Sequence, residues 1–136
     1  MRILLDNDVV LDFLTGRQPF FDEAKEIFQY LDDGKISCFI SAITPVNVFY
    51  VIRKLSGKDV ALQAVKDLLE AVEVCHTEIK ILQTATNSAI SDYEDAVQHE
   101  SAITENLDAI VTRNTKDFVN STIKVYSPKE FLEVLK

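Results

Sequence analysis

The chain has 136 residues, of which 47% are hydrophobic and 26% charged, a composition typical of a soluble globular protein with a substantial core. Its 22 acidic residues outnumber its 14 basic residues and give a net charge of −8, which argues against a protein that grips nucleic acid through a broad basic surface. The charge does not exclude an enzyme that touches nucleic acid at one metal-filled cleft, and an acidic surface favours a basic protein partner.

Short apolar segments alternate with amphipathic helical patterns along the chain. In chain order we expect a strand at Arg2–Asp6, a helix at Pro19–Asp33, a strand at Ile36–Ser41, helices at Thr44–Leu55 and Lys58–Ala71, a strand at Val72–Cys75, helices at Glu78–Ala89 and Glu94–Asn106, strands at Ala109–Thr112 and Ile123–Tyr126, and a helix at Pro128–Leu135. No repeat or flexible linker divides the chain, so residues 1–136 are expected to form a single domain.

The alternation of strands and helices predicts the α/β class, as a three-layer α/β/α sandwich with a central, mainly parallel sheet. In such folds ligands bind outside the carboxyl ends of the strands, near a topological switch point. The residues that directly follow the strands are therefore the first candidates for a functional site.

The expected cellular location and the redox state of the cysteines rest on the absence of membrane, signal-peptide and CxxC patterns. No apolar run approaches the about 20 residues that span a bilayer. The apolar segment Ile3–Leu5 stands too close to the start for a signal peptide, so we expect a cytoplasmic protein without membrane attachment. Cys38 and Cys75 have no CxxC partner and are expected to be buried reduced thiols, and His76 and His99 are too few for a zinc site.

Acidic residues gather at the ends of the expected strands. They form three clusters, namely Asp6, Asp8 and Asp12 after the first strand, Asp92, Glu94 and Asp95 at the start of a helix, and Asp117, with the amide of Asn114 nearby, after the fourth strand. Converging carboxylates repel one another unless a cation lies between them, and oxygen ligands without a nearby histidine or cysteine suit Mg²⁺ or Mn²⁺. Such an ion can activate water and neutralise charge on a phosphodiester.

Each of these acids also has a simpler interpretation. Asp6 ends a buried strand and Asp95 lies on an otherwise apolar helix face, so for these two a functional role explains the position better than solvation does. The simpler interpretations remain open for the others: a helix cap for Asp92, a cap and a polar helix position for Asp8 and Asp12, a turn for Asn114 and Asp117, and either reading for Glu94.

Four segments of the chain resemble the motifs of the PIN domain family. They are Leu5–Leu14 followed by Gly16–Phe20, Ser41–Thr44 with Tyr50–Lys54, Asp92–Ala96, and Val111–Phe118. Each motif alone is unspecific, but the four occur in order over almost the whole chain.

The resemblance implies a metal-dependent ribonuclease with a three-layer α/β/α fold. Many single-domain members are toxins of the VapC kind, which are silenced by a basic antitoxin and are often dimeric. Transferred to this sequence, the resemblance makes Asp6 and Asp95 the principal Mg²⁺ ligands, and Asp117, with Asn114, completes the acidic cluster through the metal or its waters.

The second motif departs from the usual pattern, since the place of its glutamate is taken by Asn47. An asparagine carbonyl oxygen can coordinate or orient a metal-bound water, but it brings no charge and cannot act as a base. A subset of PIN-like proteins is similar in having asparagine there together with an acid-rich third motif. Asp92 or Glu94 would then supply the missing charge.

The resulting working mechanism is hydrolysis of RNA by metal-activated water. Asp6 and Asp95 hold the ion, Asn47 and Asp117 steer its waters, and Thr112 or Asn114 positions a nearby group. The candidates for contact with RNA phosphates are Arg17, Arg53, Arg113 and Lys116, each of which is equally well explained as an ordinary surface base.

Two other functions fit parts of this pattern. A response-regulator receiver also carries acids after its first strand, but it needs a phosphoacceptor aspartate after a central strand, and the strand Ile36–Ser41 ends without one. A PIN fold kept as a binding or regulatory module with little nuclease activity is favoured by Asn47 and by the acidic net charge.

Overall fold

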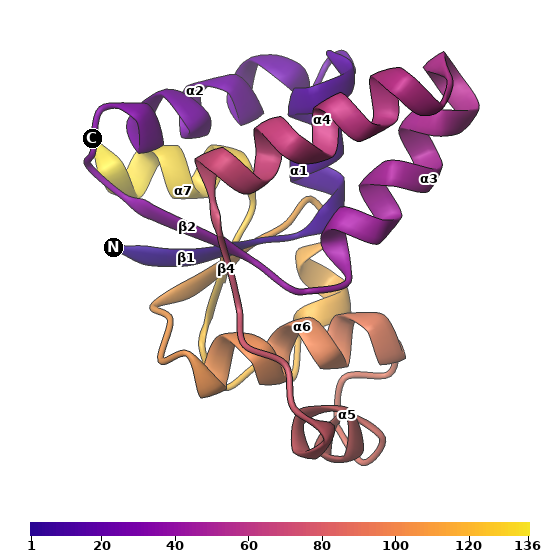
Figure 1. The fold of residues 1–136 in the computed structure, drawn as a ribbon. Helices are drawn as coiled ribbons and strands as arrows, with labels where there is room; N and C mark the ends of the chain where they lie inside the picture. The colour runs from indigo at the N-terminus through magenta and orange to yellow at the C-terminus, as the bar shows by residue number, and fades with distance from the viewer.

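The computed structural model describes residues 1–136 as one five-stranded sheet with helices on both faces (Figure 1). In chain order the elements are β1 (Arg2–Leu5), α1 (Asn7–Thr15), α2 (Phe21–Asp32), β2 (Ser37–Ile40), α3 (Thr44–Ser56), α4 (Lys58–Ala71), β3 (Glu73–Val74), α5 (Ile79–Ala85), α6 (Tyr93–Thr104), β4 (Ala109–Val111), the 3₁₀ helix η1 (Thr115–Phe118), β5 (Lys124–Tyr126) and α7 (Pro128–Leu135). The strand order is β3-β2-β1-β4-β5, and every pair is parallel.

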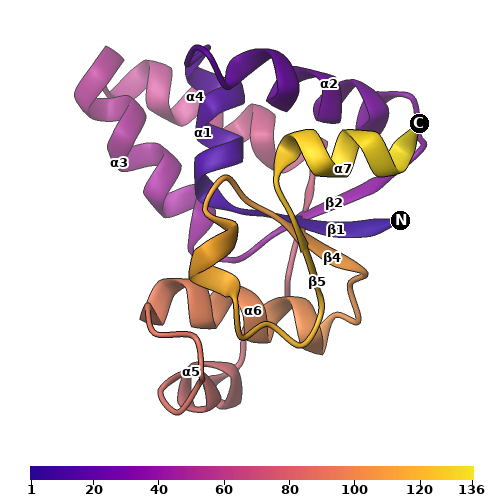
Figure 2. The ribbon, with the colours of Figure 1, turned by 180° about the vertical axis from the view of Figure 1, so that it is seen from behind.

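The sheet separates two hydrophobic cores, as expected for a three-layer sandwich. Ile3 and Leu5 of β1 point to the face that α1, α2, α3, α4 and α7 cover, and Leu4 between them points to the face that α5 and α6 cover (Figures 1 and 2). All three side chains are fully buried, because a central parallel strand is covered on both sides. The predicted α/β/α architecture is confirmed, and the sheet is entirely rather than mainly parallel.

The switch point of the sheet lies between β1 and β4. From β1 the chain moves to β2 and β3 on one side, and it then crosses back to β4 and β5 on the other side. The backbone N–H of Asp6 donates to the carbonyl of Val111 at 3.0 Å, so the residues that follow β1 and β4 are adjacent at this edge. Both chain termini lie at the opposite edge (Figure 1).

Three local features differ from the expectation. The helix α1 begins directly after Asp6 and ends at Thr15, and the φ of 65° at Gly16 lets the N–H of Arg17 donate to the carbonyl of Asp12 at 3.1 Å. The segment Thr115–Phe118, expected as a loop, forms η1. The helix predicted at Glu78–Ala89 is shorter, because after Ala85 the chain turns and buries Ile90 in the core beneath the sheet.

The cysteines lie where the sequence predicted them. Cys38 and Cys75 are buried and free, and burial raises the pKa of each thiol to about 12. None of the helices is long and apolar enough to cross a membrane.

Candidate active site

Asp6 stands at the carboxyl end of β1, where it also caps the N-terminus of α1. One carboxylate oxygen, Oδ1, accepts hydrogen bonds from the backbone N–H of Asn7 at 2.6 Å and from Nε2 of Gln98 at 2.9 Å. The other, Oδ2, accepts one from the hydroxyl of Thr112 at 2.7 Å. The side chain is buried, and these donors fix its orientation while leaving it further acceptor capacity.

An open cleft of about 380 Å³ lies beside Asp6. It is lined by Asp6, Asn7, Asp8, Leu11, Arg17, Asp92, Glu94, Asp95, Asn114 and Asp117. The lining thus contains six carboxylates from three separate segments and only one base. The three acidic clusters of the sequence converge at the switch point of the sheet.

Asp95 lies in the first turn of α6, one turn from its N-cap residue Asp92, whose Oδ1 accepts the backbone N–H of Asp95 at 3.0 Å. The pKa of Asp95 is raised to about 7, first by burial and then by repulsion from Asp6, Asp92, Asp117 and Glu94. The carboxylates are therefore crowded with too little positive charge between them.

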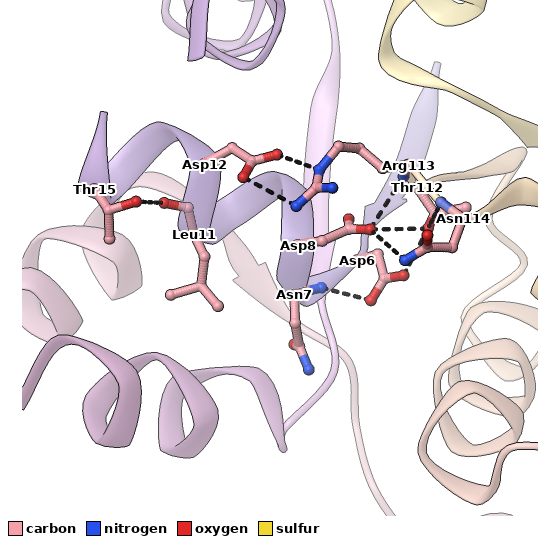
Figure 3. A network of polar contacts seen from close by, with 9 residues as sticks. All are labelled: Asp6, Asn7, Asp8, Leu11, Asp12, Thr15, Thr112, Arg113 and Asn114. Carbon is pink, nitrogen blue, oxygen red and sulfur yellow. Dashed lines mark hydrogen bonds and ion pairs between the residues drawn. The ribbon is translucent and has the colours of Figure 1, made fainter. Parts of the chain in front are cut away.

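Asp8 lies in the first turn of α1 and faces the segment after β4 (Figure 3). Its Oδ2 accepts the backbone N–H of Arg113 at 3.2 Å and Nδ2 of Asn114 at 3.1 Å. Its Oδ1 is buried without a partner. The pKa of Asp8 is raised to about 7 by burial and by Asp6, although Arg113 lowers it.

A chain of side-chain hydrogen bonds connects three helices at the rim of the cleft. The amide of Asn7 on α1 donates to a carboxylate oxygen of Glu94 on α6 and accepts the hydroxyl hydrogen of Thr44 on α3. Asn47 lies one turn further along α3, is half-buried, and does not line the cleft. The second motif thus contacts the cleft residues through Thr44.

The four bases proposed for phosphate contact occupy different places. Arg17 lines the cleft and is exposed. Lys116 on η1 and Arg53 on α3 are exposed but do not line it. The guanidinium of Arg113 is engaged by Asp12, as the structure places Nε 2.6 Å from Oδ2.

The donor chemistry of the cleft fits a hard divalent cation. Carboxylate and amide oxygens are the only potential ligands that line it, and neither histidine nor cysteine contributes. The pKa of Asp95 is raised by burial and by the neighbouring carboxylates, and a bound cation would stabilise its charged form. As the side chains stand, no group of three or more acidic, histidine or cysteine residues is arranged to hold an ion.

Several residues of the network were missed or differently assigned from sequence. Gln98, which orients Asp6, could have been found from one feature of the sequence. It follows Asp95 by three residues and therefore lies on the same face of the helix. Asp12 was read as a polar helix position, but it is 1% exposed and paired with Arg113. Asp6 rather than Asp8 caps α1, whereas the cap expected at Asp92 is present.

Solved structures with the same fold include a bacterial toxin–antitoxin complex, a VapBC protein and a VapC toxin. A toxin–antitoxin complex from Klebsiella pneumoniae is 25% identical, with a TM-score of 0.70 over 93% of this chain and 97% of that one. VapBC-1 from nontypeable Haemophilus influenzae is 18% identical, with a TM-score of 0.69 over 95% and 99% of the chains. VapC20 from Mycobacterium tuberculosis is 13% identical, with a TM-score of 0.65 over 79% and 86%.

The amino-acid sequence matches a protein family, although it matches no single curated protein. The family described as the PIN domain matches residues 2–116. This match includes Asp6, Asp95 and Asn114, and with the arrangement of the sheet and cleft it shows that the chain belongs to the PIN domain family.

Proposed function

We propose that this PIN domain is an endoribonuclease that depends on Mg²⁺ or Mn²⁺ and that serves as the toxin of a toxin–antitoxin pair. The observation that carries the proposal is the convergence of six carboxylates in one cleft at the switch point of the sheet. Keeping so many acids together is costly without a cation, and their oxygens are the ligands that these two ions take.

Asp6, Asp95 and Asp117 are the residues that would hold the ion, which when bound supplies an activated water and neutralises charge on the phosphodiester. Gln98 and Thr112 orient the carboxylate of Asp6 by donating to its two oxygens. This orientation is set before substrate arrives, and such preorganisation lowers the cost of reaching the transition state.

The acid-rich third motif compensates for the uncharged Asn47. Asp92 and Glu94 both line the cleft, and Glu94 is held in place by the amide of Asn7. We assign Asn114 to the support of Asp8 rather than to direct ligation, because its amide nitrogen donates to that carboxylate.

RNA would be held over a small area. Arg17 is the one base in the cleft lining, and Lys116 is exposed on η1 close to Asp117. We assign both to phosphate contact, with Arg53 as a more distant contact on α3. A net charge of −8 limits non-specific binding, so recognition depends on these few bases and on the ion.

The proposed partners are a basic antitoxin and a second copy of the chain. The structural neighbours from Klebsiella and Haemophilus are toxin–antitoxin complexes, and an acidic surface attracts a basic segment. Exposed apolar side chains on α3 and α4 favour a homodimer, and they include Val46, Tyr50, Leu55, Val60, Leu62 and Leu69. We place the protein in the cytoplasm, where an RNA substrate and an antitoxin would meet it.

The test is an RNA-cleavage assay with the purified chain in Mg²⁺, in Mn²⁺ and in EDTA. We expect metal-dependent cleavage that Asp6→Asn and Asp95→Asn each reduce at least about 100-fold, while circular dichroism shows both variants folded. Asp67→Asn, an exposed carboxylate on α4, is the matched control and should cleave normally. Cleavage that survives in EDTA or in both variants contradicts the proposal, and absence of both cleavage and metal binding favours a regulatory PIN module.

A further inference from the structure

The segment that follows β4 is fastened to α1 by a polar contact that the proposed chemistry does not use. Asp8 and Asp12 are one helical turn apart on α1, and both face this segment (Figure 3). Asp8 accepts the backbone N–H of Arg113, and Asp12 accepts its side chain. Arg113 is thus tied to α1 at two points.

The ion pair between Arg113 and Asp12 is bidentate and shielded. Nε lies 2.6 Å from Oδ2, and a terminal guanidinium nitrogen lies 3.3 Å from Oδ1. The Asp12 side chain is 1% exposed and the Arg113 side chain 22%. A fork-to-fork pair of this kind fixes direction as well as distance, which a single ammonium group does not.

The guanidinium also stacks on an aromatic ring. Its central carbon lies 3.9 Å from the ring centroid of Phe20, just before α2. With its Nε edge on Asp12 and a face on Phe20, the guanidinium of Arg113 is held in one orientation within the protein.

The residues held by this contact reach the cleft from one short segment. Asn114 and Asp117 line the cleft, and they follow Arg113 by one and four residues. Asp117 lies in the 3₁₀ helix η1, which begins two residues after Arg113, so the path of the chain at Arg113 sets where η1 starts. The pair with Asp12 attaches the segment to α1 at this point.

We propose that Arg113 is a positioning residue: its pair with Asp12 holds the segment 112–118 against α1 and so places Asp117 at the metal-binding cleft. The proposal rests on the proposed function for its catalytic consequence, but the ordering of the segment is a property of the metal-free protein. It replaces the assignment of Arg113 to phosphate contact.

The test compares Arg113→Gln and Arg113→Lys with the wild-type chain, and Lys129→Gln serves as the matched control. Lys129 borders the same small pocket as Arg113 but belongs to α7, so its loss removes a nearby charge without touching the segment. Backbone amide exchange is measured by mass spectrometry in EDTA. Mn²⁺ affinity by calorimetry, and kcat and KM for RNA, are measured separately.

For Arg113→Gln we expect exchange in residues 112–118 to be at least about fivefold faster, with other segments unchanged. The Kd for Mn²⁺ should rise about tenfold and kcat fall about tenfold, with KM within about twofold of wild type. Arg113→Lys should lie between, because lysine keeps the charge but loses the fork and the stack. Lys129→Gln should match wild type in every measurement.

Unchanged exchange and unchanged Mn²⁺ affinity in Arg113→Gln would overturn the proposal. A raised KM with normal kcat and normal Mn²⁺ affinity would also overturn it and return Arg113 to phosphate binding. If the wild-type chain neither binds Mn²⁺ nor cleaves RNA, the proposed function fails, and the exchange measurement still decides whether Arg113 orders the segment.

Discussion

Replacing Asp95 by asparagine removes one of the six carboxylates of the cleft and keeps a side chain of the same size. In the metal-free protein this change should be stabilising, because it removes a partly buried charge and its repulsion from Asp6 and Asp92. In the presence of Mg²⁺ the wild-type chain should be the more stable of the two, since it alone retains the full set of metal ligands. A stabilising substitution at a proposed catalytic position is a sharp expectation, as most substitutions destabilise.

The size of the effect follows from the pKa of Asp95, which is raised from 3.8 to about 7. At about 1.4 kcal/mol for each pKa unit the full difference corresponds to about 4 kcal/mol, and screening at this partly exposed side chain reduces it to about 1–2 kcal/mol. The lost charge at the N-terminus of α6 costs about 0.5 kcal/mol. The net gain is about 1 kcal/mol, or roughly 3–5 °C in Tm.

The gain should depend on pH with a definite sign. Because the pKa of Asp95 is raised in the folded state, the folded chain binds more protons than the unfolded chain between pH 4 and 7, and wild-type stability falls as pH rises through that window. The gain in Asp95→Asn is therefore fully present at pH 8 and about half as large at pH 5.5. Both conditions stay above the sequence pI of about 4.7.

The assay is thermal unfolding followed by circular dichroism, with EDTA or with Mg²⁺ at about ten times its Kd, where binding stabilises the wild type by about 1.4 kcal/mol. Asp67→Asn, on the exposed face of α4, should stay within about 0.5 kcal/mol of wild type under all conditions. If Asp95→Asn is no more stable than wild type in EDTA at pH 8, the crowding of the carboxylates has been misjudged. Equal stabilisation of both proteins by Mg²⁺ would show that Asp95 is not a ligand.

Three further substitutions or probes test other parts of the structure. Gln98→Leu loses a donor to Asp6 but also removes a buried Oε1 that has no partner, so calorimetry should show about tenfold weaker Mn²⁺ binding while denaturant unfolding changes by less than about 1 kcal/mol. Cys38 and Cys75, whose pKa values are raised to about 12 by burial, should react with a thiol reagent only after denaturant unfolds the chain; reaction in the native state would show that they are accessible. Ser127→Ala removes the capping box of α7 and should lower Tm by roughly 3–5 °C, equivalent to about 1 kcal/mol, and an unchanged Tm would mean that α7 does not need its cap.

Helices and strands could be predicted where burial alone explains the pattern of apolar residues. Strands such as β1 and β4 are buried on both faces and need an unbroken apolar run, so their position was predicted to within a residue. The helix α4 was predicted with both ends because its apolar residues recur with helical spacing. The helix α1 was not separately predicted. Its segment contains several acidic residues, and without knowledge of their partners such a segment has the pattern of a solvent-exposed turn.

The sequence by itself determined that carboxylates would follow the strands and that parallel strands would bring them to one edge. Asp6, Asp95 and Asp117 could be selected in this way, because strand ends and helix starts are local properties. The tertiary structure decided what surrounds them. Gln98 reaches Asp6 across 92 residues of sequence, and Arg113 reaches Asp12 across 101, so no local pattern records either partner.

Arg113 shows the physical reason most clearly. From sequence, its charge could be satisfied by solvent, by an RNA phosphate or by an acid of the same chain, and all three give the same local pattern. Only the packing of α1 and Phe20 beside β4 buries the Asp12 carboxylate within reach of the guanidinium. A buried charge must be paired, and that requirement, set by the tertiary structure, selects Asp12 as the partner.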